Sequence, residues 1–155
     1  MKRCYRIHSL MGNLTLVADE EGLKEIRFGW EIKEGEKEEN HPLLQSAKKE
    51  LEEYFQGKRK DFSVPLRPDG TVFQKKVWKA LTEIPYGETR TYGEIAAVVG
   101  NEKASRAVGM ANHCNPIPII IPCHRVIGKN GKLTGYAGGL EKKTVLLELE
   151  RSFEK

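Results

Sequence analysis

Residues 115–126 read NPIPIIIPCHRV, and this stretch decides how the second half of the chain folds. Its three prolines exclude a continuous α-helix, because proline lacks the amide hydrogen and clashes with the preceding turn. The three consecutive isoleucines at 119–121 require burial. We therefore predict an extended, rigid and buried segment that delivers Cys123 and His124 to a fixed place.

Cys123 and His124 are the candidate reactive pair. The thiolate is the nucleophilic form of cysteine, and a nearby base can generate it. Adjacent side chains of a strand point to opposite faces, so the pair meets only if the chain bends sharply or a water molecule bridges it. An acid would orient the imidazole, and the expected C-terminal helix offers Glu141, Glu148 and Glu150. The alternative is a buried, inert cysteine beside a core histidine.

Amphipathic helices are expected before this segment. Residues 71–74 and 91–94 have the form of capping boxes, and each precedes an apolar stripe of helical period. Asn101 is expected to cap a third helix. The inner face of that helix is predicted to hold Ala104, Ala107, Val108 and Ala111.

The second and third of these helices are joined at residues 100–101 and resemble a helix-turn-helix. Such a motif places its second helix in a groove of nucleic acid. The outer face predicted for this helix carries Lys103, Arg106, Met110 and His113. The net charge of +4 lies in residues 69–155, because positive and negative residues balance in residues 1–68. This distribution favours an anionic partner for the second half.

Strands are predicted for residues 1–30, where apolar and polar residues alternate between turn signals. We expect the charged residues 31–40 to form a surface loop and residues 43–55 to form a helix that Gly57 ends. Residues 62–64 are interpreted as one more strand.

A linker rich in proline and glycine follows residue 64 and separates two predicted domains, 1–68 and 69–155. No apolar run approaches the roughly 20 residues that span a bilayer, and no signal peptide is recognisable. We expect an intracellular, cytoplasmic protein without membrane association. Three cysteines without a C-x-x-C pair argue against disulfides and against a zinc site, so neither metal nor cofactor is expected.

Residues 122–126 (PCHRV) resemble the active-site signature of the O6-alkylguanine-DNA alkyltransferases, also called methylated-DNA–protein-cysteine methyltransferases. The similarity runs from residue 73 to residue 150 and includes TYGEIA, SRAVG, Asn-Pro and GYAGGL in the order of the family. The resemblance implies an α+β fold. A small N-terminal ribonuclease-H-like domain would precede a mostly helical domain with a DNA-binding helix-turn-helix.

The resemblance also assigns catalytic roles. Cys123 matches the alkyl acceptor, His124 the base that acts through a water molecule, and Glu150 the acid that holds the histidine. Asn115 matches the residue that ties the turn before the active site. Tyr92 matches the phenol that protonates the departing guanine.

Contacts with DNA follow from the same resemblance. Arg106 matches the arginine that fills the gap left by a flipped nucleotide. The helix that carries it would enter the groove together with Lys103, Ala107, Gly109 and Met110. The walls of the substrate pocket would include Val126, Tyr136 and Ala137.

The implied function is DNA repair by direct reversal. A methyl or alkyl group would move irreversibly from O6-alkylguanine, and also from O4-alkylthymine, in double-stranded DNA to Cys123 after base flipping. Nothing in the sequence supplies a resolving nucleophile, so each molecule would act once, as a monomer without an obligate protein partner. The alternatives are a non-catalytic DNA-binding protein and a cysteine hydrolase that uses Cys123 and His124.

Overall fold

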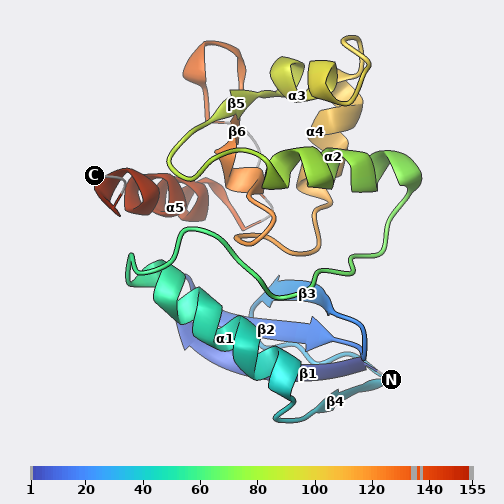
Figure 1. The fold of residues 1–155 in the computed structure, drawn as a ribbon, viewed down its shortest axis with the longest axis vertical. Coiled ribbons are helices and arrows are strands. Elements are labelled where there is room, and N and C mark those ends of the chain that lie inside the picture. The colour runs from blue at the N-terminus through green and yellow to red at the C-terminus, as the bar shows by residue number, and fades with distance from the viewer. Residues whose placement is uncertain (1, 134–135, 137, 154–155) are drawn as a thin grey trace. The chain divides into compact units, whose positions relative to one another are not determined.

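The computed structural model describes residues 2–133, 136 and 138–153. The chain divides into two compact units, Met1–Asp69 and Gly70–Lys155 (Figure 1). Strands dominate the first unit and helices the second, which confirms the α+β class. None of the helices in the described residues is long and apolar enough to cross a membrane.

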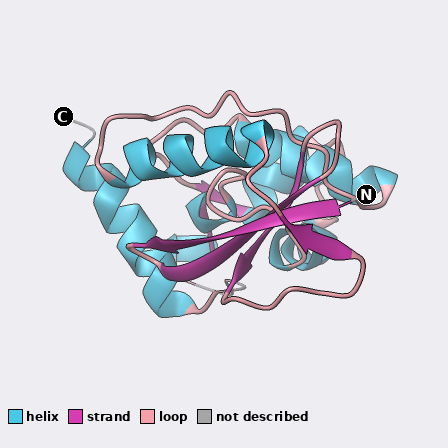
Figure 2. Cartoon of the chain, turned by 90° about the horizontal axis from the view of Figure 1, so that it is seen from below, coloured by secondary structure: helices cyan, strands magenta, loops and turns pink. Residues whose placement is uncertain are grey.

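The first unit is a twisted four-stranded sheet with one helix packed against it (Figure 2). Its strands are β1 (Lys2–Ser9), β2 (Gly12–Ala18), β3 (Leu23–Phe28) and β4 (Glu36–Glu38), in the order β3-β2-β1-β4. The pairs β1–β2 and β2–β3 are antiparallel, and β4 runs parallel to β1. Helix α1 (Pro42–Phe55) buries Leu44, Ala47, Leu51 and Tyr54. Gly57 follows it with a φ of 75°, a conformation that favours glycine after a helix.

Two sequence-based expectations for this unit are wrong. The predicted loop at residues 31–40 contains β4, which ion pairs from Arg27 to Glu36 and from Arg6 to Glu38 hold in place. The predicted strand at residues 62–64 is absent. The carboxylate of Glu50 accepts hydrogen bonds from the backbone amides of residues 63 and 64, so these amides do not enter a ladder. Instead of this strand, the chain that follows forms an isolated β-bridge, between Leu23 and Leu66.

The second unit begins with α2 (Val72–Thr82), β5 (Arg90–Thr91), α3 (Tyr92–Val98) and α4 (Ser105–His113). After them come the 3₁₀ turn η1 (Cys123–Arg125), β6 (Val126–Ile127), the 3₁₀ turn η2 (Lys129–Gly131) and α5 (Leu140–Phe153). Both predicted capping boxes are present, at the start of α2 and of α3. The indole Nε1 of Trp78 donates to the carbonyl of Ala111 at 2.8 Å and so joins α2 to α4.

Helix α4 differs from its predicted form. Asn101 does not cap it: Oδ1 of Asn101 accepts from the amide of Lys103, and the helix begins after Ala104 without a side-chain cap. Ala107 is exposed rather than turned inward. The residues of α4 that are buried are Val108, Ala111 and Asn112.

We expect Gly70→Ala to destabilise the protein. A Cβ atom on Gly70 would lie 2.5 Å from the ring of Trp78 and 3.0 Å from Oε1 of Gln74. The ring cannot retreat because it is buried and bonded to α4, and Gln74 completes the capping box of α2. Overpacking of this kind costs about 1–3 kcal/mol.

Denaturant unfolding of the wild type, Gly70→Ala and the control Gly93→Ala measures this cost. A Cβ atom on Gly93 would approach no atom closer than 3.9 Å, and alanine is the better helix former, so the control should be at least as stable as the wild type. Equal stability of all three proteins would contradict the packing described for Trp78.

Candidate active site

Asn115 organises the turn that leads to Cys123. Its Nδ2 donates to the carbonyl of Ile121 at 2.8 Å, and its Oδ1 accepts from the amide of Ile117 at 3.0 Å. Both ends of the turn are thereby fixed to one side chain. Between them, Ile119 has a φ of 75°, which is an outlier for a β-branched residue. Its side chain is buried, and this burial offsets the backbone strain.

The segment before Cys123 is buried as predicted, but it is not extended. It folds into successive turns, and Cys123 and His124 lie on η1, where the amide of Arg125 donates to the carbonyl of Pro122 at 2.9 Å. The chain therefore bends sharply at Cys123 and His124. The prolines and the amide side chain of Asn115 favour turns here, because a strand would need backbone amides that proline lacks.

The carboxylate of Glu150 is the acid beside His124. Oε2 of Glu150 lies 2.6 Å from Nε2 of His124. The guanidinium of Arg125 donates to both carboxylate oxygens, at 2.8 and 3.0 Å. Glu150 is fully buried on α5, whereas Glu141 and Glu148 are exposed. Of the three acids that the sequence offered, Glu150 is the one placed at the histidine.

These contacts define the protonation of His124. Burial alone would raise the pKa of Glu150, but hydrogen bonds from His124 and Arg125 outweigh it and lower the pKa to about 2. The carboxylate is therefore ionised and accepts a hydrogen bond from the N–H group at Nε2 of His124. Burial lowers the pKa of His124, so the ring is neutral. Its Nδ1 atom is then an acceptor, and it has no hydrogen-bond partner among the described residues.

Cys123 is a neutral thiol at rest. Its side chain is 1% exposed. Burial raises the pKa of the thiol to about 11, although a hydrogen bond with Asn115 and the positive charge of Lys143 oppose the rise. A thiol with this pKa ionises at neutral pH only with the help of a base, and the open Nδ1 of the neighbouring imidazole is an acceptor that can take the proton.

Tyr92 is brought to this region by a short parallel pairing. β5 ends immediately before Tyr92, and β6 begins two residues after His124; Arg90 pairs with Val126 and Thr91 with Ile127. Tyr92 is half-buried and lines a cavity of about 710 Å³. The other residues that line the cavity include Gly93, Ala97, Ser105 and Lys129.

The predicted DNA contacts lie on the outer side of α4 and just before it. Lys103, Arg106 and Ala107 are exposed, and Met110 is 68% exposed. A Cβ atom on Gly109 would lie 3.9 Å from the ring of Tyr92, which places Gly109 beside that tyrosine.

Of the predicted pocket residues, Val126 and Tyr136 are both buried. Ala137 lies outside the described residues. Cys114, the second thiol of this region, is exposed at the end of α4.

Sequence reasoning missed two buried cations. Arg125 is buried on Glu150 and also donates to the carbonyl of Ile84 at 2.7 Å. Lys143 is fully buried, its Nζ donates to the carbonyl of Val126 at 2.6 Å, and burial lowers its pKa to about 8. A signal was present: Lys143 lies seven residues before Glu150, so both occupy the inner stripe of one helix.

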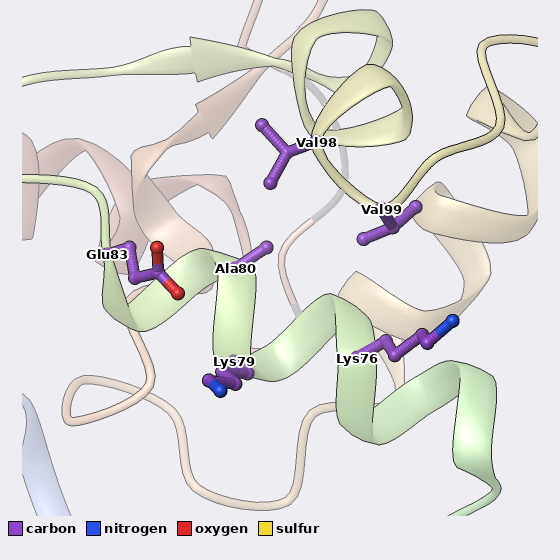
Figure 3. Close-up of a pocket in the computed structure, with 6 residues that line it drawn as sticks. All are labelled: Lys76, Lys79, Ala80, Glu83, Val98 and Val99. Carbon is purple, nitrogen blue, oxygen red and sulfur yellow. The ribbon is translucent and has the colours of Figure 1, made fainter.

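A separate pocket of about 300 Å³ lies where α2 meets the end of α3 (Figure 3). Lys76 and Lys79 extend from α2, and Val98 and Val99 from the end of α3. This pocket contains no predicted site residue. Within the described parts of the chain, no group of three His, Cys, Asp or Glu side chains could hold a metal ion.

Two family models match the chain. Residues 3–68 match the ribonuclease-like domain of the 6-O-methylguanine DNA methyltransferases, and residues 72–152 match their DNA-binding domain. The first match confirms the ribonuclease-like shape expected of the N-terminal unit.

Full-length relatives agree with these matches. The chain is 57% identical over 152 residues to the methylated-DNA–protein-cysteine methyltransferase of Methanosarcina acetivorans, covering 93% of this chain and 95% of that one. It is 50% identical over 149 residues to the corresponding protein of Mycobacterium tuberculosis, covering 94% and 90%. The crystal structure of Mycobacterium tuberculosis OGT in complex with DNA superimposes with a TM-score of 0.91 at 48% identity and covers 97% of this chain and 94% of that one.

We expect Glu150→Gln to lower the free energy of unfolding by about 3–5 kcal/mol at neutral pH, because it leaves Arg125 buried without its anion. The difference should depend on pH. The pKa of Glu150 is lowered in the folded state, so its stabilisation is complete above the ordinary value of 4.5 and is lost as pH falls from there toward about 2.

Denaturant titrations at several pH values measure this difference. Glu148→Gln is the matched control, because Glu148 is exposed on the same helix and should change stability by less than about 0.5 kcal/mol. A gap between wild type and Glu150→Gln that stayed constant down to the lowest pH would contradict the assigned ionisation.

Proposed function

The chain belongs to the 6-O-methylguanine DNA methyltransferase family, and on this premise we propose that Cys123 is the residue that takes the alkyl group. The protein is a methylated-DNA–protein-cysteine methyltransferase that repairs O6-methylguanine in DNA. The roles of individual residues follow from the site.

A single observation carries the assignment to Cys123. Nε2 of His124 is hydrogen-bonded to the ionised carboxylate of Glu150. Nδ1 therefore remains a buried acceptor without a partner among the described residues, on the residue that directly follows Cys123. The imidazole is held in the tautomer that accepts a proton on that side. A water molecule between Nδ1 and Sγ completes a relay from Cys123 to Glu150.

The transfer is an in-line displacement at the alkyl carbon. As the thiol loses its proton through the water to Nδ1 of His124, Sγ attacks the carbon, and the bond between carbon and O6 breaks. The electron pair of that bond passes to the guanine, which takes a proton from the hydroxyl of Tyr92, and the proton that His124 gained afterwards returns to the Tyr92 phenolate through water. The product is a stable thioether on Cys123 and an unmodified guanine, so each molecule reacts once.

Burial of the thiol requires the base to leave the duplex. Cys123 is 1% exposed, and the O6 atom of a paired guanine is inside the helix, so the two meet only after base flipping. The exposed Arg106 is suited to fill the gap in the stack. Ala107 and Gly109 allow α4 to approach double-stranded DNA closely. O4-alkylthymine carries its alkyl group at the corresponding edge of the base and is a second substrate. The protein acts as a monomer.

Cys123→Ser is expected to abolish methyl transfer and to leave DNA binding intact, because a serine hydroxyl ionises far less readily than a thiol. The protein is mixed with duplex DNA that contains O6-methylguanine and is then weighed by mass spectrometry. The wild type should gain one methyl group, and peptide mapping should place it on Cys123. Cys114→Ser is the matched control, because this thiol is exposed and outside the relay, and it should react as the wild type does.

Other results would contradict the assignment. A methyl group on Cys123→Ser would move the acceptor to another residue. An unchanged mass of the wild type despite binding would indicate a non-catalytic DNA-binding protein. A wild-type adduct that disappeared with time would indicate a hydrolase.

Arg106→Ala should slow repair of duplex DNA about tenfold or more, since the loss of one hydrogen-bonding, stacking side chain costs at least one or two kcal/mol. The reaction with free O6-methylguanine base, which needs no flipping, should change little. Arg151→Ala is the control, because Arg151 is an exposed arginine of α5. An equal loss on both substrates would mean that Arg106 supports the fold rather than extrusion.

A further inference from the structure

Asn112 is a buried amide that the relay does not use. It lies on the inner face of α4, is 3% exposed, and its Nδ2 is 3.4 Å from the carbonyl oxygen of Cys123. A carbonyl oxygen only accepts hydrogen bonds, so the nitrogen of the amide must be the atom that faces it. The orientation of the carboxamide is thereby fixed.

The other end of this amide is open. Oδ1 of Asn112 is buried and has no hydrogen-bond partner among the described residues. A buried acceptor without a partner is costly, and such groups in native proteins call for an explanation. The open Nδ1 of His124 is explained by the proton relay, whereas Asn112 is joined to the backbone of the reactive residue and has no role in proton transfer.

The chemistry of the substrate supplies a partner. Alkylation at O6 removes the proton from N1 of guanine, so the 2-amino group is the remaining donor on that edge of the base. An alkylated O4 likewise removes the proton from N3 of thymine, and thymine has no amino group. An acceptor beside Cys123 can therefore pair with alkylated guanine and not with alkylated thymine.

We propose that Oδ1 of Asn112 accepts a hydrogen bond from the 2-amino group of O6-alkylguanine and makes Asn112 a specificity determinant for guanine. The inference rests on the proposed function and extends it to base selection. Nδ2 of Asn112 anchors the amide to Cys123, and Oδ1 reads the base that the thiol attacks.

The test changes the base and the protein together. Duplexes of one sequence carry either O6-methylguanine or O6-methylhypoxanthine, which is the same base without the 2-amino group. Single-turnover methylation rates are measured by mass spectrometry for the wild type and for Asn112→Leu, whose side chain is of similar size and forms no hydrogen bond. The two bases differ in the cost of flipping, but this difference is common to both proteins and cancels in the comparison.

The wild type should methylate itself from O6-methylguanine roughly tenfold or more faster than from O6-methylhypoxanthine, because the second base leaves a buried acceptor unpaired. Asn112→Leu should lose most of this preference. Gln45→Leu is the control: it removes another amide with an unpartnered buried nitrogen, from α1 in the other unit, and should keep the wild-type preference.

Two results would overturn the inference. If Asn112→Leu lowered the methylation rate equally for both bases, the amide would only stabilise the fold or bind a water molecule. If the wild type showed no preference between the bases, the inference would fail even where Asn112→Leu did not fold. A wild type that took no methyl group from O6-methylguanine would instead contradict the proposed function, and the two failures are thus distinguishable.

Discussion

The carboxylate of Glu150 is the group on which the second unit depends. It accepts from the imidazole of His124, from the guanidinium of Arg125 and, at 3.3 Å, from the amide of Gly87. It therefore joins α5 to the turn that carries Cys123 and to the chain after α2. Such a buried ionic group is stable only when its hydrogen bonds are satisfied. We therefore expect α5, the turn that carries Cys123 and the chain after α2 to fold cooperatively.

Other buried polar groups extend this arrangement to the backbone. Lys143 holds β6 through the carbonyl of Val126, Arg125 holds the chain just after α2 through the carbonyl of Ile84, and Asn115 holds the turn before Cys123. Each of these side chains binds a backbone carbonyl that lies in a turn, just after a helix or at the start of a short strand. The irregular path of residues 115–125 is thus specified by side chains rather than by a backbone ladder.

Much of this was predictable from the sequence. Capping boxes fixed the starts of α2 and α3, and proline and isoleucine in one short run indicated that the segment before Cys123 is buried. The path of that segment was not predictable, because it depends on the side chain of Asn115 and on a left-handed Ile119, which local preference disfavours. Ala107 was misplaced because an alanine-rich helix has no single apolar face. The resemblance to a family, and not spacing, distinguished Glu150 from Glu148.

The burial of Cys123 has a consequence for the lifetime of the protein. Oxidants attack thiolates that solvent can reach. The thiol of Cys123 has a pKa near 11 and is 1% exposed, so almost none of it is present as a solvent-accessible thiolate. A catalyst that turns over repeatedly can tolerate some inactive copies, but a reagent that is consumed in one event cannot be recovered after a side reaction. Under the proposed mechanism, the packing around Cys123 therefore protects the sulfur from oxidation until a flipped base enters and the relay removes its proton.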